Sequence, residues 1–422
     1  MAVGGPPVKS LVRPEPIACA GGMADTGLGV RGDLPAPQVA RAASGESGGS
    51  AASAESAGLA AEGRVPGEAD AVTFGIEEEF VFLDRRTLCT VDVGVVAVAD
   101  LGEPGSSAVV REFFPSQIEF ATPICTRGAQ ALAALREFRG RLAEWADDAD
   151  VLVAASGTPF RTVVEPATWQ GRYAVIADDI AGLAPEHQLN GLHVHVGIPD
   201  RDAGVRASNF LRPWLPVLLA LSANSPFWQG QDTGFASWRA IHSRRWTTHS
   251  TPPYFADAAE YDEALERLAG VGATSDAGTI NWYARLSRAH PTLEIRVCDA
   301  QLDPTSSVAL AAIIRALVVT GFTRETPRPQ RYEGLDAAQW HAARHGMAST
   351  LVDPVTGHPV PAVVVVEALR ELVAAHLDPA EARAVDGFLA HIARFGTGAA
   401  RQGRAHHRRQ LAELYRTRLA GE

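Results

Sequence analysis

The chain of 422 residues contains a single lysine, Lys9, among 38 basic residues. This scarcity excludes a Walker-type phosphate loop, a Schiff-base lysine and a Ser–Lys catalytic pair from the rest of the chain. Any phosphate group must therefore be bound by arginine, by backbone amides or through a metal ion.

Cysteines are few, and no long apolar run is present. The four cysteines show neither a CxxC motif nor zinc-type spacing, which favours a reducing compartment: Cys19, Cys89, Cys125 and Cys298. The most apolar stretches are short or broken by Pro216 and Arg315, and no compact signal-peptide core is present near the N-terminus. A net charge of −11 argues against nucleic-acid and anionic-membrane partners. We therefore predict a cytoplasmic protein with small-molecule partners.

Residues 1–70 are rich in Gly, Ala, Ser and Pro, and we expect a disordered, low-complexity tail there. Two motifs in this tail lack the strand and helix that would make them functional. They are a GxGxxG match at Gly27–Gly32 and a GxSxG match at Gly45–Gly49. Residues 71–422 are predicted to form a single catalytic domain.

Hydrophobic spacing predicts the elements of this domain. Strands are expected at 72–83, 88–93, 151–156, 192–196, 279–286 and 292–298. A polar stretch containing Trp169, Arg172 and Tyr173 follows the strand at 151–156, and 230–249 is predicted to be a loop. Helices are expected at 127–149, 208–221, 258–269, 304–322, 361–376, 379–394 and 398–420. Strands without regular βα alternation favour an α+β fold with a mostly antiparallel sheet and flanking helices.

Several predicted strands carry acids or histidines on one face. Strand alternation points Glu77 and Glu79 to the same side, and it does the same for His193 and His195. Glu119 lies in a third apolar segment, and Glu294 shares a strand face with Arg296. Such groups are rarely buried unless they are paired or bind a metal. A plain Glu294–Arg296 ion pair and a structural His195 are the alternatives.

Converging carboxylates need cations, or they must take up protons. Two carboxylates about 4 Å apart repel by roughly 4 kcal/mol at an effective dielectric near 20. Oxygen-rich sites suit Mg²⁺ or Mn²⁺, which most often serve enzymes that handle phosphates. The sequence therefore predicts a magnesium or manganese site on one sheet face.

Five ordered motifs resemble the type 2 glutamate–cysteine ligase family, and more narrowly its bacterial carboxylate–amine ligase branch. They are Phe74-Gly-Ile-Glu-Glu-Glu79, Gln117-Ile-Glu-Phe-Ala-Thr-Pro123, Gly191-Leu-His-Val-His-Val-Gly197, Asn224-Ser-Pro-Phe-Trp228 and Leu293-Glu-Ile-Arg-Val-Cys-Asp299. The resemblance runs from about residue 72 to residue 420.

This resemblance implies a funnel-like sheet related to the catalytic fold of glutamine synthetase and glutamate–cysteine ligase. It also implies ATP, magnesium, and an acyl phosphate that an amine converts to an amide. By motif position, the metal ligands would be Glu77, Glu79, Glu112, Glu119, His193 and Glu294. Arg296 would touch the transferred phosphate.

Substrate contacts and assembly are less constrained by the motifs. Arg172, Tyr173 and Arg239 lie in polar loops where a carboxylate or phosphate could be clamped, and His195 could orient substrate. Surface or structural roles are the alternatives for each of these residues. A homodimer is the working expectation.

Two other functions fit parts of the pattern. A metal-dependent hydrolase would use His193 and His195 as a ligand pair, but it would need further zinc-type ligands. A non-catalytic nucleotide or amino-acid sensor on a ligase scaffold would keep the same site without turnover.

Overall fold

The computed structural model describes residues 72–103, 106, 108–163, 169–274, 277–324, 326, 333–405 and 407–419. The predicted disordered tail and its two motifs lie outside these residues, so the division of the chain near residue 70 stays a prediction.

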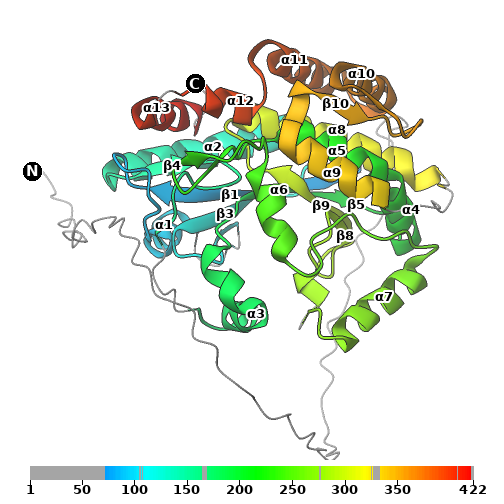
Figure 1. The fold of residues 1–422 in the computed structure, drawn as a ribbon, viewed down its shortest axis with the longest axis horizontal. Coiled ribbons are helices and arrows are strands. Elements are labelled where there is room, and N and C mark those ends of the chain that lie inside the picture. Colours follow the sequence, from blue (N-terminus) through cyan, green and yellow to red (C-terminus); the bar gives the residue numbers. More distant parts are fainter. Residues whose placement is uncertain are drawn as a thin grey trace, which may run out of the picture. The chain divides into compact units, whose positions relative to one another are not determined.

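The strands form one large sheet and two small ones (Figure 1). The seven-stranded sheet has the order β2-β3-β1-β5-β9-β8, and β4 also pairs with β1. Its strands are β1 (Phe74–Leu83), β2 (Val109–Arg111), β3 (Gln117–Ala121), β4 (Leu152–Ala154), β5 (Gly191–Gly197), β8 (Ala284–Leu286) and β9 (Thr292–Asp299). All its pairings are antiparallel. The small sheets pair β6 (Phe227–Trp228) with β7 (Gln231–Asp232), and β10 (Thr350–Val352) with β11 (Pro359–Pro361). The predicted α+β fold with a mostly antiparallel sheet is confirmed.

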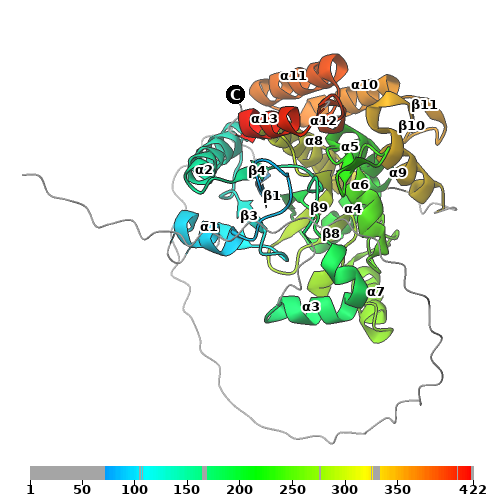
Figure 2. The ribbon, with the colours of Figure 1, turned by 60° about the vertical axis from the view of Figure 1, so that its left-hand side comes forward.

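Helices cover the sheet in layers. The α-helices are α1 (Gly94–Leu101), α2 (Gly128–Asp148), α3 (Arg172–Ile180), α4 (Arg201–Leu211), α5 (Leu215–Ser222), α6 (Trp238–His242), α7 (Ala258–Gly270), α8 (Pro304–Thr323), α9 (Glu333–His345), α10 (Ala362–Val373), α11 (Pro379–Phe395), α12 (Gly398–Gly403) and α13 (Arg408–Leu419). The central helix α8 contacts β1 and β5, and α2, α4, α10 and α11 pack around it. Both views place α3 and α7 on the opposite side of the sheet from α10 and α11 (Figures 1 and 2).

Aspartates mark where several helices begin. The side chain of Asp200 accepts a hydrogen bond from Ala203 N at the start of α4. Equivalent bonds cap α7, α8 and α11, from Asp257, Asp303 and Asp378 respectively. Each such cap stabilises a helix by about 1 kcal/mol, because it satisfies a backbone N–H with no partner inside the helix.

By its length and composition alone, helix α8 is long and apolar enough to span a membrane, with a mean hydropathy of 1.7. The sequence prediction that no apolar run reaches this length is therefore wrong by that test. However, 78% of the helix window is buried inside the structure, as expected for the core helix on which the other helices pack.

Other sequence predictions were wrong in their details. The Val-rich segment after residue 93, for which no element was predicted, forms helix α1, in which Ala97 and Leu101 bury one helical face. The predicted strand at 88–93 is reduced to isolated bridges at Cys89 and Thr90. Helices α3, α6 and α9 occupy segments where no helix was predicted, because their buried faces are short or built from small residues.

Two predicted helices are interrupted. The segment predicted as 208–221 begins earlier, at Arg201, and is divided by a 3-10 turn at Arg212–Trp214 that contains Pro213. The helix predicted at 398–420 is two helices, and α12 ends at Gly403.

A buried ion pair joins the helix side of β1 to α2. Glu78 and Arg139 are almost fully buried, and the guanidinium donates to both carboxylate oxygens, at 2.9 and 2.8 Å. Ser307 of α8 also donates to Glu78. Arg139 donates further to the carbonyl oxygens of Gln301 and Leu302. One guanidinium thus connects the central strand, α2 and the start of α8.

Removing Arg139 should strongly destabilise the fold. We expect Arg139→Leu to lower the free energy of unfolding by about 3–5 kcal/mol, because Glu78 would remain buried without a partner. Arg136→Leu, one turn earlier on the exposed face of α2, should change it by less than about 0.5 kcal/mol. Urea denaturation measures both, and equal effects would contradict the role given to the pair.

Candidate active site

One face of the large sheet carries a continuous row of charged and imidazole side chains. Residues directly opposite each other on neighbouring antiparallel strands share a sheet face. The opposite pairs on this face are Glu79–Glu119, Glu77–His193, His195–Glu294 and Arg285–Glu294. The row therefore crosses β3, β1, β5, β9 and β8, joining residues more than 200 positions apart in the chain.

Three carboxylates meet at the β1–β3 end of this row. One oxygen each from Glu79, Glu112 and Glu119 lies within 4.8 Å of the others. Burial, together with Glu112, raises the pKa of Glu79 to about 8. Burial and the charge of Glu77 raise the pKa of Glu119 well above its usual value. Without a cation, this end of the site holds protons at neutral pH.

Glu77 lies between the two histidines of β5. Its two oxygens lie 3.2 Å from His193 Nδ1 and 3.2 Å from His195 Nε2. Burial alone would raise the pKa of Glu77, but these hydrogen bonds hold it well below its usual range. The two histidines differ: burial lowers the pKa of His193 to about 4, whereas the contact with Glu77 outweighs burial and raises that of His195. His195 Nδ1 also lies 2.9 Å from Thr292 Oγ1.

Glu294 is held by two arginines. Arg285 donates to both of its oxygens, at 2.8 and 3.2 Å, and Arg296 forms a close ion pair with Oε1. These cations outweigh burial and lower the pKa of Glu294. The structure therefore contains the Glu294–Arg296 ion pair that the sequence analysis gave as an alternative to a metal ligand. A cation at Glu294 would share an oxygen with an arginine.

Arg239 reaches the same cavity from α6. Its Nη2 donates to the Arg296 carbonyl oxygen at 3.1 Å, and its Nη1 lies 3.9 Å from the buried Asp299. Asp299 accepts hydrogen bonds from the hydroxyls of Ser225 and Ser237, at 2.7 and 2.9 Å. The Asn224-Ser-Pro motif thus positions Arg239 through Asp299.

Aromatic rings surround the α3 side of the cavity. Phe113 stacks on Trp169 at 5.3 Å and meets Tyr173 edge-on at 5.7 Å. Tyr173 donates its hydroxyl to the Arg111 carbonyl oxygen at 3.1 Å. Arg172 begins α3 beside them and is exposed.

All eleven site residues predicted from the sequence line one cavity of about 450 Å³. They are Glu77, Glu79, Glu112, Glu119, Arg172, Tyr173, His193, His195, Arg239, Glu294 and Arg296. We call this space the acidic cavity. The structure brings the residues together, and their individual roles stay predictions.

Sequence reasoning missed several residues of the acidic cavity. Arg285 could have been found by extending the β8–β9 hairpin register to the position opposite Glu294. His187 and His249 lie in irregular segments that carry no pattern. Burial and the nearby His242 lower the pKa of His187 to about 3, and burial and Arg239 keep that of His249 well below its usual value. This end of the cavity combines neutral imidazoles with arginines.

The donor set fits a hard divalent cation. Three groups of potential ligands share members, so they could hold neighbouring ions: Glu79–Glu112–Glu119, Glu77–Glu119–His193 and Glu77–His195–Glu294. Carboxylate oxygens predominate, and no cysteine takes part, which suits Mg²⁺ or Mn²⁺ better than zinc.

A model of the glutamate-cysteine ligase family 2 (GCS2) matches residues 73–417. The chain belongs to this family. The family resemblance predicted from the sequence is confirmed, and so is the predicted enzyme class, an ATP-dependent ligase.

Relatives from several organisms match most of the chain. “Putative glutamate--cysteine ligase 2” of Salinispora tropica is 40% identical over 345 residues, which cover 80% of this chain and 91% of the relative. “Putative glutamate--cysteine ligase 2-2” of Saccharopolyspora erythraea is 38% identical over 349 residues, with 80% and 89% covered.

Solved structures show the same fold at low sequence identity. Glutamate–cysteine ligase of Francisella tularensis in complex with AMP matches with a TM-score of 0.64 and 12% identity, covering 83% of this chain and 88% of that one. A bifunctional glutathione synthetase from Pasteurella multocida matches with a TM-score of 0.63 and 14% identity, covering 83% and 52%. The predicted relation to the glutamate–cysteine ligase fold is confirmed.

The protonation of Glu79 predicts how stability depends on pH in the absence of divalent cations. The pKa of Glu79 is raised from 4.5 to about 8. The contribution of protonated Glu79 to the stability of the folded state is therefore full below the unfolded pKa. This contribution is lost as pH rises through the folded pKa. Between about pH 7 and 8.5, where unfolded histidines are largely neutral, the urea midpoint in EDTA should fall.

Two variants and one addition check this assignment. Glu79→Gln should show a smaller fall, whereas Glu371→Gln, on the exposed face of α10, should behave like the parent. Adding Mg²⁺ should raise the midpoint more at the higher pH, because the cation replaces the proton. A midpoint that rises with pH in EDTA would overturn the assignment.

Proposed function

We propose that the chain is an ATP- and Mg²⁺-dependent carboxylate–amine ligase that forms an amide through an acyl phosphate. Glutamate and cysteine are the first candidate substrates. The observation that carries the proposal is the row of opposite residues on one sheet face, in which Glu79 lies beside Glu119, Glu77 beside His193, and Glu294 beside His195 and Arg285, all lining one cavity. The AMP bound in the Francisella tularensis ligase supports a nucleotide as one ligand.

The acidic residues would hold Mg²⁺ or Mn²⁺ in adjoining positions, with Glu77 and Glu119 shared between groups. When bound, such cations neutralise phosphate oxygens and align the phosphoryl group with the attacking carboxylate. His193 is neutral at physiological pH, so a ring nitrogen is available as a ligand without loss of a proton.

Because Lys9 is the only lysine of the chain, arginines would supply the positive charge in the acidic cavity. Arg296 lies on the cavity face of β9, where its guanidinium can stabilise charge on the transferred group. Arg239 and Arg172 line the same cavity and are suited to a substrate carboxylate, because a guanidinium fork matches its two oxygens. Tyr173 and His195 would orient the bound acid and amine.

A substrate screen coupled to ADP release tests the function directly. The full chain would be incubated with ATP, Mg²⁺ and pairs of amino acids and amines, and products would be identified by mass spectrometry. We expect ADP formation that depends on the acid, the amine and the divalent cation. With the acid alone, hydroxylamine should trap the acyl phosphate as a hydroxamate.

Other outcomes would identify a different function. Zinc-supported hydrolysis without nucleotide would favour the metal-dependent hydrolase. ATP binding without turnover across the panel would favour the sensor. A folded protein that binds no ATP in calorimetry would overturn the ligase proposal.

Glu77→Gln should abolish divalent-dependent turnover while the fold is retained. The change keeps the side-chain size but removes the charge shared by two ligand groups, so we expect kcat to fall by about 10²–10³. Circular dichroism and the urea midpoint check the fold. Glu371→Gln is the matched control on the exposed face of α10, and a parental rate in Glu77→Gln would contradict the ligand assignment.

Cytoplasmic location and a homodimeric assembly stay part of the proposal. Size-exclusion chromatography with light scattering measures the assembly of the purified chain.

A further inference from the structure

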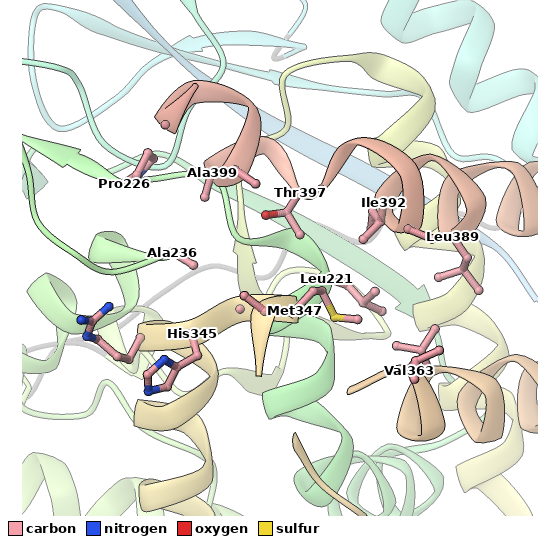
Figure 3. A pocket seen from close by; sticks show the side chains of 18 of the residues that line it. Leu221, Pro226, Ala236, His345, Met347, Val363, Leu389, Ile392, Thr397 and Ala399 are labelled. Carbon is pink, nitrogen blue, oxygen red and sulfur yellow. The ribbon is translucent and has the colours of Figure 1, made fainter. Parts of the chain in front are cut away.

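A second and larger cavity, of about 1060 Å³, lies among α9, α10, α11, α12 and the loop that follows α5 (Figure 3). It shares no lining residue with the acidic cavity. We call it the apolar cavity.

The walls of the apolar cavity are mainly hydrocarbon. Leu221, Met347, Val363, Leu389 and Ile392 line it from four different segments (Figure 3). Residues with little or no side chain make up much of the remaining wall: Gly346, Ala348, Ala390, Ala393, Gly396, Ala399, Ala400 and Gly403. Such small residues leave the space open. A cavity of this size and apolarity is typical of sites for small organic ligands.

Most charged groups at its edge are already partnered. Arg370 donates to Asp386 at 2.7 Å and to Glu367 at 2.9 Å. Asp232 accepts from the Gly234 backbone N–H at 2.8 Å. These contacts give each of the three acids that line the cavity a hydrogen-bond donor from the protein.

Arg344 is different. Its guanidinium lies over the Phe235 ring, 5.3 Å from the centroid. Across the described part of the chain, no carboxylate lies within 4.0 Å of it. The adjacent His345 is an imidazole and cannot supply a negative charge. Burial and the nearby His341 and Arg344 lower its pKa. The apolar cavity therefore has one half-buried cation without an anionic partner.

We infer that the apolar cavity binds a free apolar monocarboxylate, with its carboxylate on Arg344 and its hydrocarbon body against Leu389, Ile392 and Met347. A guanidinium binds a carboxylate through two parallel hydrogen bonds, and the surrounding apolar wall strengthens that interaction. The hydrocarbon body gains from removal of its surface from water. This site is separate from the ligase chemistry and does not depend on it.

Calorimetry with straight-chain acids tests the inference on the full chain in the absence of ATP. Hexanoate, octanoate and decanoate should bind at one site per chain, with affinity rising along the series because each added methylene buries more apolar surface. Octanol, which has the same body as octanoate without the charge, should bind at least about tenfold more weakly.

Matched variants locate the site. Arg344→Gln should weaken octanoate binding by about tenfold, because the charge-assisted hydrogen bonds are lost. Arg394→Gln is the control, since Arg394 also lies over a phenylalanine ring, that of Phe395 at 4.8 Å, but does not line the cavity. Ala390→Phe, which places a ring inside the cavity from an exposed position on α11, should weaken all three acids.

Several results would overturn the inference. These are equal binding of octanol and octanoate, equal loss in the Arg344 and Arg394 variants, or binding that Ala390→Phe leaves unchanged. Acid binding that vanishes as the chain self-associates would instead mark the cavity as a contact between copies. Because Glu77→Gln should bind octanoate normally, failure here is distinguishable from failure of the proposed ligase function.

Discussion

Repulsion between carboxylates on neighbouring strands is the constraint around which the seven-stranded sheet is organised. Glu79 and Glu119 lie directly opposite each other, and Glu77 lies two residues away on the same strand face. The chain reduces this repulsion in two ways. At the β1–β3 end the acids retain protons, and at the β5–β9 end Glu77 and Glu294 are balanced by histidines and arginines. The protonated acids at the β1–β3 end could exchange their protons for cations. The contacts at the β5–β9 end hold in place the side chains that would face those cations.

The central strand β1 carries acidic side chains on both faces, but only those on one face have an arginine partner. Glu78 points to the helices and is neutralised by Arg139, which closes a structural connection between β1, α2 and α8. Glu77 and Glu79 point to the acidic cavity and have no such arginine of their own within 4.0 Å in the described residues. Strand β1 therefore contributes a buried ion pair on its helix side and two carboxylates without an arginine partner on its cavity side.

Much of this arrangement follows from period-two patterning. Alternation in β1, β5 and β9 was sufficient to predict which side chains share a face, and the antiparallel register then brings them together. Arg172 and Tyr173 were placed correctly near the site, although the helix that carries them, α3, was not predicted. The roles of His187 and His249 depend on loop geometry set by tertiary packing, and no local pattern encodes it. The second cavity was not predicted either, since it forms only where the consecutive helices α9, α10, α11 and α12 pack around the loop that follows α5.

The near absence of lysine has a consequence for how the enzyme can be controlled. Every positive side chain that lines the acidic cavity, other than histidine, is a guanidinium, which stays protonated throughout the physiological range. Lysine acetylation, which removes a positive charge, therefore has no target among the described residues that line this cavity. Proton and cation availability can therefore change the charge of the acidic side chains, while the charge of the guanidinium groups stays constant.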